Sequence, residues 1–77
     1  MNVFLEKGNT CLDLHGEIHH DVHDLSIDFV YRYQDKLPLL IICGNSQRMI
    51  DIVENSLEIN SIGFSSPRFG IIRIEKI

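Results

Sequence analysis

Hydrophobic and polar residues alternate along this chain with two different periods, which predict strands and helices in turn. In the stretch 10–16, TCLDLHG, the period is two residues, as in a half-buried strand. Leu12 and Leu14 then share the core-facing side, and Asp13 and His15 project from the other. The glycine after His15 ends the strand, so a carboxylate and an imidazole are delivered together to its carboxyl end.

Two later segments have helical spacing, with apolar residues recurring at intervals of three and four. The first runs from about His19 to Gln34, and its predicted inward residues are Val22, Leu25, Phe29, Val30 and Tyr33. The second runs from about Gln47 to Glu58, and its predicted inward residues are Met49, Ile50, Val53 and Leu57.

The remaining segments read as strands and turns. Residues 39–43 are almost continuously apolar, which is typical of a central strand. Residues 62–65 predict a short strand, 66–68 a turn and 70–77 a final strand. Residues 2–6 can form either a short edge strand or an extended arm.

The element order β-α-β-α-β-β predicts an α/β domain over residues 10–77, preceded by an arm or edge strand at 1–9. Both crossovers should be right-handed, so both helices should cover one face of a four-stranded sheet. The carboxyl ends of the first two strands then lie side by side, which brings His15 close to the turn at 43–46. Open α/β sheets tend to bind their ligands at this edge.

Composition limits what kind of protein this is. Seventy-seven residues, 44% of them hydrophobic, allow one domain with a modest core. No apolar run approaches the roughly 18 residues that span a bilayer, and the N-terminus lacks a signal peptide's apolar region, so we expect a cytoplasmic protein without a membrane partner. Cys11 and Cys43 lie in apolar runs and should be free, buried thiols rather than a disulfide.

The charge balance is acidic, with eleven Asp and Glu against seven Lys and Arg and a net charge of −4. Overall charge therefore argues against non-specific duplex binding, which normally needs a basic face. A local basic patch stays open, because Arg48, Arg68, Arg73 and Lys76 fall in the second half, whereas residues 17–28 contain no Lys or Arg.

From residue 10 to residue 77 the chain resembles the Smr family, the small MutS-related domain. LDLHG at 12–16 matches the first family motif letter for letter, and the two helices, the apolar strand ending in a glycine turn and the strand that begins GIIRI match the family layout. The resemblance implies a two-layer sandwich whose mixed four-stranded sheet has the order 1-2-4-3. It also implies nucleic-acid binding, with DNA nicking or RNA cleavage, in DNA repair, recombination or translation quality control.

The second family motif, HGxGxG, is largely absent. The matching place reads CGNSQR, so that Gly44 is kept, Cys43 replaces the histidine, and Ser46 and Arg48 replace the later glycines. The usual double glycine before the last strand is reduced to Gly70. These departures bear on catalysis more than on the fold.

His15 is the candidate acid/base on a phosphodiester, because imidazole exchanges protons at cellular pH. Asp13 would orient His15 or hold a cation. The structural alternative is that His15 caps the turn and Asp13 bonds to neighbouring backbone.

A phosphate seat is predicted at the turn before the second helix, where free backbone N–H groups and the helix dipole attract anions. The candidate nucleic-acid-binding residues are Gly16, Gly44, Asn45, Ser46, Arg48, Arg68 and Arg73. The alternatives are an ordinary Asn/Ser cap with a solvated arginine at the turn, and an ion pair between Arg73 and Glu75 on the last strand.

Four histidines, at positions 15, 19, 20 and 23, are close enough in sequence to be considered as metal ligands. His19 and His23 are four apart on the predicted helix, a spacing that can hold one ion, but no complete zinc spacing is present. We therefore expect solvated histidines. The sequence requires no cofactor and leaves a divalent cation, Mg²⁺ or Mn²⁺, open.

The leading hypothesis is an Smr-like nucleic-acid-binding domain, either binding alone or acting as a weak endonuclease with His15 as acid/base. The alternative is a non-catalytic protein-interaction module whose acidic first helix faces a basic partner. A monomer is favoured over an oligomer, although an uncovered edge strand leaves dimerisation open.

Overall fold

A computed structural model describes residues 2–77, which form a five-stranded sheet with two helices. The elements in chain order are β1 (Asn2–Glu6), β2 (Asn9–Asp13), α1 (His19–Arg32), the 3-10 turn η1 (Gln34–Lys36), β3 (Leu39–Ile42), α2 (Gln47–Ile59), β4 (Gly63–Arg68) and β5 (Ile71–Lys76). The sheet order is β1-β2-β3-β5-β4, with β2 and β3 parallel and the other pairs antiparallel. No helix within residues 2–77 is both long enough and apolar enough to cross a membrane.

The α/β class is confirmed, but the prediction of four strands was wrong. Residues 2–6 form a fifth strand, β1, which pairs with β2 from Asn2 opposite Asp13 to Glu6 opposite Asn9. The tight turn at Lys7 and Gly8, both with positive φ, joins the two strands into a hairpin. The edge-strand alternative for the N-terminus is therefore the one adopted, and the other four strands follow the order 1-2-4-3.

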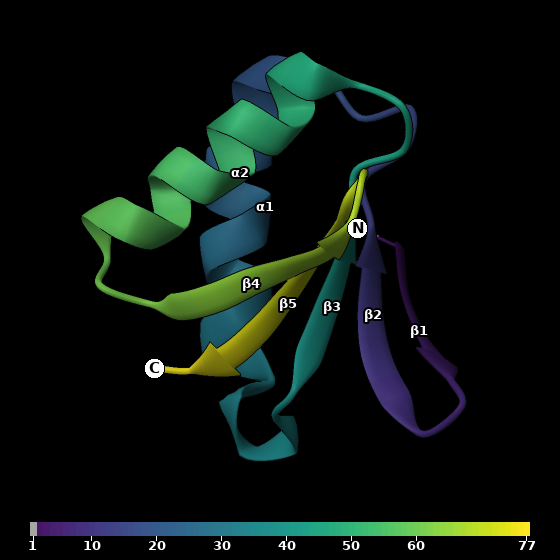
Figure 1. Cartoon of the computed structure of the whole chain (residues 1–77), viewed down its shortest axis with the longest axis vertical. Helices are drawn as coiled ribbons and strands as arrows, with labels where there is room; N and C mark the ends of the chain where they lie inside the picture. Colours follow the sequence, from purple (N-terminus) through teal and green to yellow (C-terminus); the bar gives the residue numbers. More distant parts are fainter. Residues whose placement is uncertain (1) are drawn as a thin grey trace.

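One face of the sheet carries the hydrophobic core. Cross-strand rows bring together Leu12, Ile41 and Ile72, and next to them Leu39 and Ile74, all fully or almost fully buried. These residues form a single cluster with the buried side chains of both helices, Val22, Phe29, Val30, Met49, Ile50, Val53 and Leu57. Both helices therefore lie on the same side of the sheet (Figure 1). Each such side chain contributes about 2 kcal/mol by leaving water.

The two helices are also joined by a polar contact. The Ser56 hydroxyl donates to the backbone carbonyl of Ile52 at 2.7 Å and lies 2.6 Å from Nδ1 of His23. The Ser56 hydroxyl has one proton, and it donates that proton to the Ile52 carbonyl. Nδ1 of His23 is therefore the donor in the second contact. This fixes which ring nitrogen of His23 carries a proton and ties α1 to α2.

The turn predicted at 66–68 was wrong, because β4 continues to Arg68 and the chain reverses at Phe69 and Gly70. Pro67 normally signals a turn, but here it lies in an edge strand with a pairing irregularity between Ser65 and Arg68. A missing N–H is tolerated at such a position.

The reversal at Gly70 packs directly on the turn after β3. The Cys43 backbone N–H donates to the Gly70 carbonyl at 2.7 Å, and a Cβ added to Gly70 would clash with the Gly44 carbonyl oxygen. Gly70 also has a φ of +84°, which disfavours any side chain. The end of β3 and the start of β5 are thus locked backbone to backbone.

Gly70→Ala should lower the free energy of unfolding by about 3 kcal/mol, through left-handed strain and a clash with immovable backbone. Gly8→Ala is the matched control, since Gly8 has a φ of +83° and nothing within 4 Å of an added Cβ. The control should cost only about 1 kcal/mol, the strain alone. Urea unfolding of both variants measures the difference, and equal losses would show that the Gly44–Gly70 contact is not tight.

Candidate functional site

The loops that follow β2 and β3 meet at one edge of the sheet (Figure 1). Residues of both loops line an open hollow of about 410 Å³. We call it the His15 hollow. It is lined by His15, Gly16, Glu17, His19, Cys43, Asn45, Ser46 and Met49. Four of the predicted site residues, His15, Gly16, Asn45 and Ser46, are therefore brought together by the fold.

The first loop is held in place by its anchor in the core. Leu14 is fully buried, and its N–H donates to the Ile42 carbonyl at 2.9 Å, which extends the β2–β3 pairing by one step. The Leu14 carbonyl accepts from the Glu17 N–H at 3.0 Å, across a turn in which Gly16 has a φ of +86°. The chain leaves the core between these contacts, so the exposed His15 lies at the rim of the hollow.

Asp13 does not line the hollow. Its Oδ1 accepts the backbone N–H of His15 at 2.8 Å, which is the structural alternative foreseen for this residue. The carboxylate therefore fixes the backbone that carries His15 and makes no hydrogen bond to the imidazole itself. Asp13 is best described as a positioning residue.

The second loop forms the N-terminal end of α2. The Ser46 hydroxyl accepts the Met49 N–H at 3.2 Å, and the Ser46 carbonyl accepts the Ile50 N–H at 3.1 Å. Ser46 is thus the helix cap, and the N–H groups of Gln47 and Arg48 have no acceptor within the helix. Together with the positive end of the helix dipole, they make this rim of the hollow attractive to an anion.

Gly44 lies directly beside His15. A Cβ on Gly44 would be 3.6 Å from Cδ2 of the imidazole, an ordinary contact, but Gly44 has a φ of +70°. Glycine is therefore needed here for its backbone conformation rather than for space.

The three predicted arginines do not line the His15 hollow. Arg73 lies on the sheet face opposite the core, and its Nε is 3.7 Å from Glu75 Oε2, the ion pair foreseen as its alternative. Arg68 ends the cross-strand row that runs from Asn2 through Asp13, Ile42 and Ile71. It therefore lies on the far edge strand, β4, three strands away from Asp13. Arg48 is exposed on the first turn of α2.

Glu17 and His19 line the hollow, yet the sequence analysis did not assign them to the candidate site. His19 had been considered only as a metal ligand with His23, whose Nδ1 is occupied by Ser56. Within residues 2–77 no three His, Cys, Asp or Glu side chains gather in a way that could hold a metal ion. The signal that could have found His19 is its position in the first turn of the helix that follows LDLHG.

Cys43 occupies the place where the family motif has a histidine. Its thiol is buried and free, as is that of Cys11. Burial, and secondarily the negative charge of Glu54, raises the Cys43 pKa from 9.0 to about 12. The thiol is therefore protonated at neutral pH and supplies neither a nucleophile nor an acid/base group to the hollow.

The raised pKa of Cys43 predicts a loss of stability in alkali. The unfolded chain releases the Cys43 proton above pH 9.0 and the folded chain only near pH 12, so unfolding becomes more favourable as pH rises between these values. Cys43→Ala should lower stability at every pH by leaving a small cavity, but its stability should fall less steeply over this range. Denaturant unfolding at several pH values measures both slopes, and parallel slopes would contradict the prediction.

No family model, curated protein or solved structure matches this chain. The resemblance to the Smr family therefore stays a prediction made from the LDLHG motif and the element order.

Proposed function

We propose that this chain is an Smr-like nucleic-acid-binding domain that seats a backbone phosphate in the His15 hollow and cleaves phosphodiesters slowly, with His15 as the acid/base. One observation carries the proposal. The His15 imidazole and the N-terminal end of α2 border the same hollow, so an anion-attracting helix end faces a group that can transfer protons.

The binding half of the proposal rests on local rather than overall charge. The first turn of α2 contains no acidic residue, and Asn45 offers an exposed amide at the rim. Glu17 is the one acid lining the hollow. With a net charge of −4, the domain should contact few phosphates, so binding should be modest and should weaken as salt rises.

The cleavage half follows from what one imidazole can do. On RNA, the His15 imidazole would take the proton of a ribose 2′-hydroxyl, whose oxygen bonds to the adjacent phosphorus while the bond from phosphorus to the 5′-oxygen breaks and that oxygen takes a proton from water. On DNA, the same imidazole would take a proton of an attacking water molecule, whose oxygen bonds to phosphorus while one phosphorus–ester oxygen bond breaks and the departing oxygen takes a proton from water. Because Cys43 cannot assist as a second acid/base, a slow reaction is expected.

A second candidate function is favoured by the outer face of α1. Asp21 and Asp24 are exposed there, and neither takes part in an ion pair within residues 2–77. A basic protein surface could be bound by this acidic face, in which case the fold would serve as a protein-interaction module.

Asn45→Asp should weaken binding to single-stranded RNA and DNA about tenfold, because a new carboxylate at the phosphate seat repels the backbone. The matched control is Asn55→Asp, which adds the same charge at an exposed position in the middle of α2. Fluorescence anisotropy at low salt measures both affinities. If the two variants bind equally well, the phosphate does not sit at the end of α2.

His15→Ala should abolish cleavage of labelled branched DNA and structured RNA, tested with Mg²⁺, with Mn²⁺ and with EDTA. Its thermal midpoint should barely move, because His15 is exposed and no hydrogen bond of its ring supports the fold. His20→Ala is the control, since His20 is also exposed but does not line the hollow. Cleavage that survives in His15→Ala would remove His15 from the mechanism.

The two candidate functions give different results at low salt. Salt-sensitive binding of oligonucleotides supports the nucleic-acid reading. Absence of oligonucleotide binding, together with binding to a basic protein that Asp21→Asn and Asp24→Asn weaken, supports the interaction module instead.

A further inference from the structure

A second concavity lies between α2 and the β4–β5 turn, with a volume of about 300 Å³. We call it the Phe69 groove. Its lining residues are Gln47, Ile50, Glu54, Ser66, Arg68, Phe69, Gly70, Ile71 and Ile72. The first turn of α2 borders both concavities, Ser46 on the His15 hollow and Gln47 on the groove. The two concavities therefore adjoin the same turn of α2.

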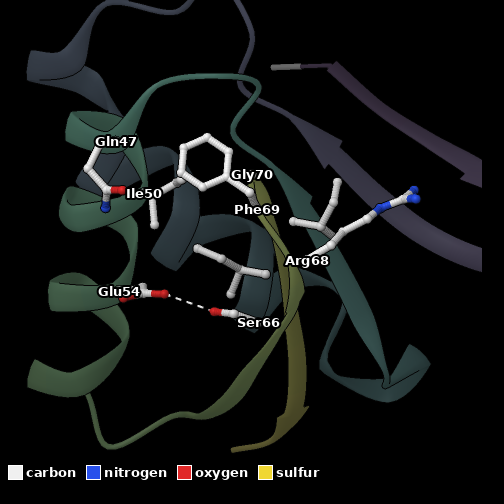
Figure 2. Close-up of a pocket in the computed structure, with 9 residues that line it drawn as sticks. Gln47, Ile50, Glu54, Ser66, Arg68, Phe69 and Gly70 are labelled. Carbon is white, nitrogen blue, oxygen red and sulfur yellow. Dashed lines mark hydrogen bonds between the residues drawn. The ribbon is translucent and has the colours of Figure 1, made fainter.

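Phe69 is the most unusual side chain of this groove. It is 61% exposed, although it is a large aromatic residue at the tip of a tight turn. Figure 2 shows its ring directed toward α2, near Gln47 and Ile50, whereas Arg68 points away from the groove. An exposed ring at a fixed turn is a surface on which a nucleobase can stack, because every base has a flat π-face.

At the opposite end of the groove, a hydrogen bond from Ser66 fixes the position of the Glu54 carboxylate. Ser66 Oγ donates to Glu54 Oε2 at 3.0 Å, so one carboxylate oxygen is engaged (Figure 2). The other oxygen, Oε1, is left to accept a hydrogen bond from a ligand. A carboxylate repels phosphate but accepts well from an exocyclic amino group, such as N4 of cytosine. Ile50 and Ile72 form an apolar wall between Phe69 and Glu54.

We infer that the Phe69 groove binds one nucleobase that carries an exocyclic amino group, within a single strand whose neighbouring phosphate sits in the His15 hollow. The inference rests on the proposed function and adds to it a base preference and a strand state. A volume of about 300 Å³ is at the small end for a ligand pocket and suits one base. A paired base is excluded, because both of its faces are covered by stacking within the duplex and neither can lie on the Phe69 ring.

The test measures binding of three labelled oligomers of equal length, oligocytidine, oligouridine and an abasic sugar–phosphate chain. Cytosine and uracil differ at position 4, where an amino group replaces a carbonyl oxygen, so they isolate the contact with Glu54. The wild-type protein should bind oligocytidine about tenfold more tightly than oligouridine, and the abasic chain least tightly.

Three variants assign the effect to residues. Phe69→Leu should weaken binding of both base-containing oligomers about tenfold and leave the abasic chain unchanged. In Glu54→Gln the side-chain oxygen can still accept from Ser66, but the new amide NH2 can donate to the carbonyl oxygen at position 4 of uracil. The preference for cytosine over uracil should therefore disappear. Tyr31→Leu is the control for a lost aromatic ring, since Tyr31 is 41% exposed on α1 and does not line the groove. It should change no affinity by more than about twofold.

The outcomes separate this inference from the proposed function. Equal binding of all three oligomers, or affinities unchanged in Phe69→Leu, would overturn the base site while leaving the phosphate seat intact. A cytosine preference that survives in Glu54→Gln would overturn the role of the carboxylate. No binding of any oligomer by the wild-type protein would overturn the base site and the proposed nucleic-acid function together.

Discussion

The close approach of two glycine backbones, Gly44 and Gly70, is the constraint on which the rest of the structure depends. The hydrogen bond from the Cys43 N–H to the Gly70 carbonyl joins the turn after β3 to the turn before β5, and there is no room for a Cβ on Gly70. The contact sets where α2 begins, because α2 follows Gly44 after two residues. The two concavities next to the first turn of α2 therefore owe their positions to one backbone contact.

The domain is acidic overall, yet its charges are unevenly placed. Acidic side chains are exposed on α1, whereas the first turn of α2 has none and presents N–H groups without helical acceptors. The start of α2 is therefore more favourable for an anion than the acidic face of α1. The proposed binding of one or two phosphates would use this place alone, unlike the extended basic surface of a protein that binds duplexes by charge.

The LDLHG stretch has both a structural and a chemical interpretation. In LDLHG, Leu12 and Leu14 are buried and hold the strand in the core, and Asp13 accepts the backbone N–H of His15. Folding thus accounts for Leu12, Asp13 and Leu14. It also accounts for Gly16, whose positive φ forms the turn that follows. His15 is the one residue of the motif that the fold does not evidently need. Any chemical role of the motif therefore depends on His15.

Hydrophobic spacing alone predicted the two helices, most of their inward residues and the α/β class, because burial periodicity is a local property of the chain. The buried Ser26 and Ser56 have no such signal in the sequence. The N-terminal strand was left open and the β4–β5 turn was misplaced, because β1 is stabilised by pairing with β2 and Pro67 is tolerated only through the edge position of β4. The sequence also brought His15, Gly16, Asn45 and Ser46 into one site, since parallel neighbouring strands end at the same edge. Only the tertiary structure separated Arg68 and Arg73 from that site, added Glu17 and His19, and opened the Phe69 groove, because these depend on register and on side-chain direction across distant segments.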